Sequence, residues 1–256
     1  LLNLEADNRP LAYELGYKYF WSFNLEVNES TLIPRFDTEV LVDVSIERIL
    51  KWKRSHPNRV CKIAELGTGT AAIPIALCSE LTDLQITSVD VFPNVLEVAN
   101  RNVQKYEKLL TPRNNSIELI LNNLFPDSLE EQDFIISNPP YVRSNNISNP
   151  HEPHSALDGG IDGLDFYRYL LECDWAVKSD GEMILEIGGD QKNDFYHPYW
   201  SKPKFIFEKQ NELFNVAVLS KDTKKDIILE PEELINLKHI RRKISREIEE
   251  FKIQYM

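Results

Sequence analysis

An Asn-Pro-Pro-Tyr tetrapeptide at residues 138–141 is the feature that most directly suggests chemistry. Proline has a fixed φ and no N–H donor, and it pushes the preceding residue into an extended conformation. The corner is therefore stiff and rich in carbonyls. It fits a planar –NH2 group, whose N–H bonds donate to the Asn138 side-chain oxygen and a proline carbonyl while an aromatic ring packs on its plane. We interpret these four residues as catalytic and substrate-binding: Asn138, Pro139, Pro140 and Tyr141. The alternative is a structural loop that uses the prolines to end a strand.

A glycine turn and an acidic residue further along the chain indicate a cofactor. Gly67 and Gly69 follow an apolar segment and let the backbone turn sharply, with no Cβ in the way of a ligand. A helix whose first N–H groups lack partners is expected to follow the turn. Asp90 ends the next apolar segment, at about the distance suited to binding ribose hydroxyls. The pattern favours a nucleoside-bearing cofactor over a plain tight turn, and it leaves the identity of the cofactor open.

An alternating series of strands and helices must position these residues. Apolar runs predict strands over 60–66, 86–90, 117–121, 134–137, 183–187, 204–208 and 214–219, and helical spacing predicts helices over 38–53, 71–80, 93–107 and 163–178. Strands separated by helices predict an α/β, doubly wound, mostly parallel seven-stranded sheet. Its ligand should bind beyond the carboxyl ends of the strands, where the glycine turn, Asp90 and the 138–141 corner all fall.

The rest of the chain divides into flanking segments. We expect an N-terminal hairpin and linker over 1–36, the ligand-binding domain over 37–225 and a C-terminal amphipathic helix over 226–256. That helix packs on the same chain or binds a partner. The chain starts without methionine, which we interpret as a trimmed start.

Composition narrows the class of protein. The 256 residues carry 29 Lys+Arg against 41 Asp+Glu, a net charge of −12, so we expect no direct nucleic-acid partner. No apolar run approaches the ~20 residues that span a bilayer, so we expect no membrane association. Three widely spaced cysteines suggest a reducing intracellular compartment and are interpreted as small buried side chains.

Several weaker groups of residues keep two interpretations. Residues 35–39 contain Arg35, Asp37, Thr38 and Glu39, which either line the cofactor entrance or cap and begin a helix. His151, Glu152 and His154 have a metal-like spacing but no third strong ligand, so we expect no metal site. Glu186 is either a core carboxylate or an acid at a strand end near the cofactor.

With these motifs in place, the sequence resembles the HemK/PrmC family of class I, S-adenosylmethionine-dependent glutamine methyltransferases. The resemblance runs from about Arg9 to Gln191, and its most specific segment is Leu-Ile-Pro-Arg-Phe-Asp-Thr-Glu at 32–39. It implies a Rossmann-like fold and methyl transfer from S-adenosylmethionine to the amide nitrogen of the glutamine in the Gly-Gly-Gln motif of a class I peptide-chain release factor, during translation termination. It also implies a monomer located in the bacterial cytoplasm or the mitochondrial matrix.

The resemblance assigns site residues as well. It implies that the cofactor is held by Gly67, Thr68, Gly69, Thr70, Ala71, Asp90, Asn123, Leu124 and Asn138, and that Arg35 joins the 138–141 corner in binding substrate. Asn123 stands where the family has an acidic residue, Ala71 where it has glycine and Phe36 where it has proline. The family's N-terminal helical domain is largely missing, and the last ~60 residues do not match the family's usual ending. Three alternatives stay open: an adenine or other nucleobase N-methyltransferase, a nicotinamide oxidoreductase, and a non-catalytic adaptor of the same fold.

Overall fold

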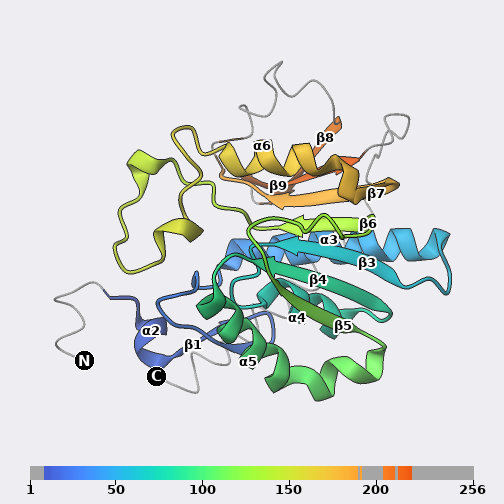
Figure 1. Ribbon diagram of the computed structural model, residues 1–256, viewed down its shortest axis with the longest axis horizontal. Helices are drawn as coiled ribbons and strands as arrows, with labels where there is room; N and C mark the ends of the chain where they lie inside the picture. The colour runs from blue at the N-terminus through green and yellow to red at the C-terminus, as the bar shows by residue number, and fades with distance from the viewer. Residues whose placement is uncertain (1–8, 190, 192–203, 211–212, 221–256) are drawn as a thin grey trace. The chain divides into compact units, whose positions relative to one another are not determined.

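The fold is built on one twisted seven-stranded sheet, seen in a computed structural model that describes residues 9–189, 191, 204–210 and 213–220 (Figure 1). The strands are β3 (Cys61–Leu66), β4 (Leu84–Asp90), β5 (Ser116–Leu121), β6 (Gln132–Ser137), β7 (Val177–Glu186), β8 (Lys204–Gln210) and β9 (Leu213–Ser220). Their order is β5-β4-β3-β6-β7-β9-β8. The strands from β5 to β7 run parallel, and β9 is antiparallel to both of its neighbours. The predicted mostly parallel α/β sheet is therefore confirmed.

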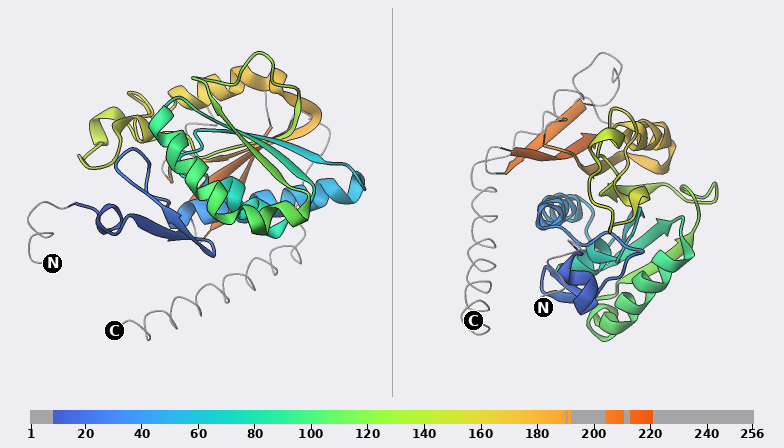
Figure 2. Two further views of the ribbon diagram at one scale, coloured as in Figure 1. Left: turned by 60° about the horizontal axis from the view of Figure 1, so that its bottom comes forward. Right: turned by 90° about the vertical axis from the view of Figure 1, so that its left-hand side faces the viewer.

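Successive residues of a strand point to opposite faces of the sheet, so apolar strands expose apolar side chains on both faces. Helices cover both of these faces. Ile63 and Ile184 face a core shared with α3 (Phe36–Ser55), α4 (Ala72–Glu80) and α5 (Pro93–Leu110). Their neighbours Ala64 and Leu185 face a second core under α6 (Asp165–Glu172). The left panel of Figure 2 shows the sheet between α6 on one side and α3 and α5 on the other.

The strand order reverses between β3 and β6, and this reversal locates the site. From β3 the chain moves outward through β4 to β5, and it then returns to place β6 on the other side of β3. Ligands of such sheets bind in the crevice where the order reverses, beyond the carboxyl ends of the strands. In Figure 1 the arrows of the parallel strands β3, β6 and β7 point toward the loop over 142–163, which contains the short 3-10 helices η2 (Ser144–Asn146) and η3 (His154–Ala156).

A short N-terminal unit lies against the helical layer. Helix α2 (Leu11–Leu15) precedes the antiparallel hairpin of β1 (Tyr17–Phe20) and β2 (Phe23–Glu26). The hairpin is tied to α5, because Asn102 Oδ1 accepts the Glu26 N–H at 2.7 Å and Tyr106 Oη accepts the Asn24 N–H at 3.0 Å. The hairpin expected before residue 37 is present, and it covers α5 and the start of α3.

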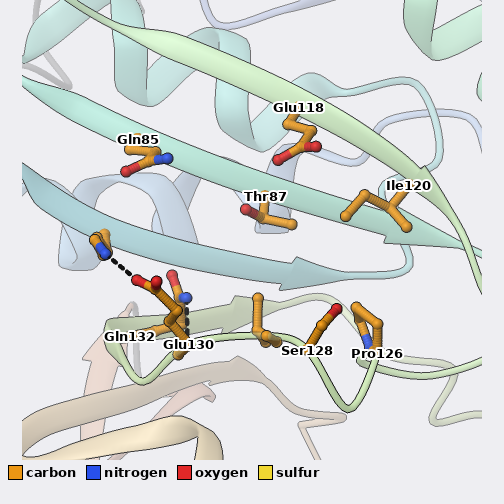
Figure 3. Close-up of a pocket in the computed structure, with 10 residues that line it drawn as sticks. Gln85, Thr87, Glu118, Ile120, Pro126, Ser128, Glu130 and Gln132 are labelled. Carbon is orange, nitrogen blue, oxygen red and sulfur yellow. Dashed lines mark hydrogen bonds and ion pairs between the residues drawn. The ribbon is translucent and has the colours of Figure 1, made fainter.

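On the α6 face, no helix of the described residues covers β4 and β5. The connection over 122–131, which joins β5 to β6, is a loop, and beneath it lies a pocket of about 230 Å³ (Figure 3). Polar Gln85, Thr87 and Glu118 line it, as a face left near water requires. Gln85 and Gln132 stand in the amino-terminal parts of their strands. The pocket therefore lies away from the carboxyl edge and is not the candidate site.

Element boundaries correct several expectations. Helix α3 begins at Phe36, with Arg35 at the N-cap and no side-chain cap, so the capping interpretation of residues 37 and 38 is wrong. The helix predicted over 163–178 begins at Asp165 and ends at Glu172, where the 3-10 helix η4 (Cys173–Ala176) takes over. The helix expected over 226–256 lies outside the described residues. All three cysteines are buried with free thiols.

Among the residues that the structure describes, no helix has both the length and the apolar character to cross a membrane.

Candidate active site

The glycine turn joins β3 to α4 and leaves open space beside it. Gly67 and Gly69 have φ of +77° and +54°, conformations that side chains rarely adopt, and no atom of the described residues lies within 4 Å of a Cβ built on either one. The other residues predicted to bind the cofactor here, Thr68, Thr70 and Ala71, are buried. The backbone of the two glycines is therefore open to the approach of a ligand.

Asp90 stands at the end of β4, directly beside this turn. Its Oδ2 accepts the Gly69 N–H and its Oδ1 accepts the Phe92 N–H, both at 3.2 Å. Burial raises the pKa of the carboxyl, while these backbone donors lower it. The Asn122 N–H donates to the Asp90 carbonyl at 3.0 Å, which places Asn123 and Leu124 next along the same edge of the sheet. Carboxylate, open turn and loop together fit a nucleoside whose ribose hydroxyls reach Asp90.

The Asn-Pro-Pro-Tyr corner follows β6, the strand on the other side of β3. Ser137 Oγ donates to the Leu66 carbonyl at 2.7 Å, so the start of the corner is tied to the last residue before Gly67. Asn138 is half-buried, and its Nδ2 donates to Thr38 Oγ1 at 2.9 Å. The corner and the glycine turn therefore lie side by side at the carboxyl edge of the sheet.

Tyr141 is anchored at its polar tip. Its hydroxyl donates to Glu186 Oε1 at 3.0 Å, and its ring is packed against the core under α6. Pro139 is buried and Pro140 is half-buried. The phenol thus faces a carboxylate at the end of β7, and the ring forms a fixed wall of the corner.

The loop over 142–163 folds back onto the corner. The Val142 N–H donates to the Leu157 carbonyl and the Gly159 N–H donates to the Val142 carbonyl, both at 2.9 Å. Gln191 Nε2 clamps the same region by donating to the carbonyls of Tyr141, at 3.1 Å, and Gly163, at 3.0 Å. Backbone hydrogen bonds on one side and the Gln191 side chain on the other therefore hold the corner in place.

Glu152 connects this loop to the segment before α3. Its buried carboxylate accepts the Ile33 N–H at 3.2 Å and Asn149 Nδ2 at 2.8 Å, and it pairs with the guanidinium of Arg35. Arg35, predicted to bind substrate, is thus held by Glu152 and stays partly exposed. Within the described ranges no group of three or more His, Cys, Asp or Glu side chains is arranged to hold a metal ion.

Gly159 is required by close packing, and Gly159→Ala tests this. A Cβ there would lie 2.8 Å from the Pro140 carbonyl oxygen and from Tyr141 Cα, both backbone atoms of the corner. We expect a loss of about 1–3 kcal/mol in unfolding free energy, typical of overpacking, together with reduced turnover. Urea unfolding measures the first effect, and an assay of the activity proposed below measures the second. The exposed loop variant Ser155→Ala should match the wild type, and an equally stable Gly159→Ala would contradict the packing argument.

Glu65, before the glycine turn, is buried at 1% exposure and accepts the hydroxyls of Thr68 at 2.7 Å and Ser88 at 2.8 Å. Burial raises its pKa to about 8, against ~4.3 in an unfolded chain. The folded state therefore binds the extra proton, and the stability from this group is lost as pH rises from the unfolded pKa through about 8. As pH rises from 6 to 9, the free energy of unfolding of Glu65→Gln should increase relative to that of the wild type by on the order of 2 kcal/mol. Urea unfolding at each pH measures this difference. A stability difference that does not change with pH would rule this out.

The structure brings together residues that the sequence analysis kept apart or left undecided. Thr38, considered only as a cap or part of an entrance, contacts Asn138 across 100 positions of sequence. Glu186, which the sequence left open between a core carboxylate and an acid near the cofactor, accepts a hydrogen bond from the Tyr141 hydroxyl. The available signal was positional, since Glu186 ends a strand that runs parallel to and beside β6.

The chain is similar to known proteins in both sequence and fold. The family described as "Methyltransferase small domain" matches residues 48–150, which carry the glycine turn, Asp90 and the corner. A methyltransferase from Pyrococcus furiosus of known structure has the same fold, with a TM-score of 0.52 at 19% identity over 86% of this chain and 99% of that one. The fold is that of a Rossmann-like class I methyltransferase.

Two curated relatives narrow the class. A release factor glutamine methyltransferase of Pasteurella multocida is 35% identical over 240 residues, which cover 86% of this chain and 74% of that protein. A bifunctional methyltransferase of Rickettsia felis is 35% identical over 222 residues, which cover 75% of this chain and 41% of that longer protein. The chain belongs to the release factor glutamine methyltransferase family.

Proposed function

We propose that this chain transfers the methyl group of S-adenosylmethionine to the side-chain amide nitrogen of the glutamine in the Gly-Gly-Gln motif of a peptide-chain release factor. The observation that carries the proposal is the position of Asn138. The corner that carries Asn138 is tied to the glycine turn by the hydrogen bond from Ser137 to Leu66. Asn138 Nδ2 donates to Thr38, which leaves Oδ1 to accept a substrate N–H. Membership of the family supports the same reaction.

The residues along the carboxyl edge fit S-adenosylmethionine. Asp90 would accept the ribose hydroxyls, and the bare backbone of Gly67 and Gly69 would lie against the cofactor. Asn123 would accept the adenine amino group through its amide oxygen, with Leu124 beside the ring. When bound, the sulfonium supplies a methyl group that is already strongly activated.

The chain's own contribution is to position a poor nucleophile. An amide nitrogen is weakly nucleophilic because its lone pair is delocalised into the carbonyl. Asn138 Oδ1 and a proline carbonyl of the corner accept its two N–H bonds, and this holds the nitrogen in line with the methyl group and removes water from it. The nitrogen would gain positive character as the new N–C bond forms and the S–CH3 bond breaks, with its electron pair left on sulfur in S-adenosylhomocysteine. The same oxygens would therefore bind the transition state more strongly than the ground state. The proton then leaves the nitrogen for water.

Mass spectrometry of a recombinant release factor tests the proposal. After incubation with this chain and S-adenosylmethionine, the peptide containing Gly-Gly-Gln should gain the mass of one methyl group. A release factor with that glutamine changed to alanine is the matched control and should gain nothing. Methyl incorporation into adenine of a nucleic acid, with none into the release factor, would overturn the proposal in favour of the nucleobase alternative.

A further inference from the structure

Thr38 lies between Asn138 and Glu186. It is in the first turn of α3 and is buried at 5% exposure, and its Oγ1 accepts the N–H of Asn138 Nδ2 at 2.9 Å. The Thr38 hydroxyl also lies close enough to the carboxyl of Glu186 to lower the pKa of that carboxyl. Tyr141 donates to Glu186 Oε1, and Oε2 has no hydrogen-bond partner of ordinary geometry among the described residues.

The direction of these hydrogen bonds follows from the number of hydrogens available. A hydroxyl has one hydrogen to donate, and an ionised carboxylate only accepts. If the Thr38 hydrogen goes to Glu186, its oxygen can only accept from Asn138, so the amide must present Nδ2 to Thr38. The amide oxygen then points the other way. Without this constraint the two ends of an asparagine amide are almost equal in size and can exchange places.

We propose that Thr38 and Glu186 are positioning residues that fix the orientation of the Asn138 amide, so that Oδ1 and not Nδ2 meets the substrate nitrogen. This inference rests on the proposed function for its consequence in turnover, but the amide orientation is a property of the chain alone. Neither residue touches substrate in this account, because both act through Asn138.

Several groups face Glu186 and set its charge. They are the hydroxyls of Thr38 and Tyr141, the carboxylate of Asp37, the guanidinium of Arg35, and Tyr167, whose hydroxyl donates to the Glu186 carbonyl at 2.7 Å. Burial raises the pKa of Glu186 to about 7, which outweighs the hydroxyl donors and Arg35. Below that pH the carboxyl carries a proton and can donate to Thr38, whose hydrogen is then free to turn toward Asn138. Turnover should fall as pH drops through this range.

Variants at Thr38 measure the effect on the reaction. Thr38→Val keeps the shape but removes the hydroxyl, and it should lower kcat about tenfold, the lower end of the range for supporting-shell changes, with the dissociation constant for S-adenosylmethionine unchanged. Thr38→Ser restores the hydroxyl and should recover most of the loss. Ser45→Ala removes another buried hydroxyl from α3, one that donates to the Leu41 carbonyl at 2.6 Å, and should alter stability alone.

A variant at Glu186 tests the pH dependence. Glu186→Gln should flatten the fall in kcat below pH 7.

The amide itself is observed by NMR of protein labelled with 15N-asparagine, with the Asn138 side-chain signals assigned by their loss in Asn138→Asp. These signals should move strongly in Thr38→Val and return toward their original positions in Thr38→Ser. Unmoved signals in Thr38→Val, or a kcat loss that Thr38→Ser does not recover, would overturn the proposal. If the signals respond as expected while the wild type leaves the release factor unmethylated, the positioning inference stands and the proposed function fails.

Discussion

Asn138→Ala is expected to lower methyl transfer about 100-fold or more, in the range found when one preorganised polar group of an active site is removed. The alanine retains the stiff proline corner but has no oxygen to accept the substrate N–H. The interaction lost is the one that strengthens as the nitrogen becomes positive, so kcat should fall rather than the affinity for the cofactor. A radiolabelled methyl-transfer assay measures turnover, and calorimetric titration with S-adenosylmethionine measures affinity.

Comparing Asn138→Ala with Thr38→Val separates the loss of the amide oxygen from the loss of a structural hydrogen bond. Asn138 is half-buried and bonds Thr38, so its loss also removes one hydrogen bond of the site. Thr38→Val breaks that same hydrogen bond while keeping the Asn138 oxygen. Its kcat should fall about tenfold, against about 100-fold for Asn138→Ala. Equal losses would show that the bond to Thr38 and not the amide oxygen matters, and near-wild-type turnover in Asn138→Ala would remove the basis of the proposed mechanism.

Asp90→Ala is expected to weaken binding of S-adenosylmethionine about 100-fold. Hydrogen bonds to a charged group contribute ~1.5–3 kcal/mol each, and one or two such bonds to ribose hydroxyls correspond to that loss. The same carboxylate accepts the Gly69 N–H, so the variant also loosens the turn against which the cofactor lies. Calorimetric titration measures the dissociation constant, and thermal shift with S-adenosylhomocysteine reports binding to the folded state.

A charge-matched control tests whether the position matters. Glu107→Gln removes one negative charge from the exposed surface of α5 and should leave cofactor affinity unchanged. Asp90→Asn keeps one acceptor and should fall between the wild type and Asp90→Ala. Binding by Asp90→Ala within threefold of the wild type would show that the ribose lies elsewhere.

The sequence alone was enough to predict the order of elements and the edge of the sheet that carries the site. Short apolar runs, helix-length spacers and glycine at the first turn are local signals, and topology turns them into a position in space. Gly67 and Asn138 each follow a strand and Asp90 ends a third one, and parallel strands place their carboxyl ends together. The same reasoning explains why β8 and β9, expected at 204–208 and 214–219, appear within about two residues of prediction.

Only the tertiary structure decided which groups face each other across the site. Glu152 pairs with Arg35 across 117 positions, and Thr38 reaches Asn138 across 100. Neither pair has a periodic signal, because a hydrogen bond depends on ångström-scale placement of two chain segments that only packing brings together. For the same reason the sequence mistook Thr38 for a possible helix cap and left Glu186 undecided. A carboxylate in the core and one that directs an asparagine look identical until the neighbours of each are known.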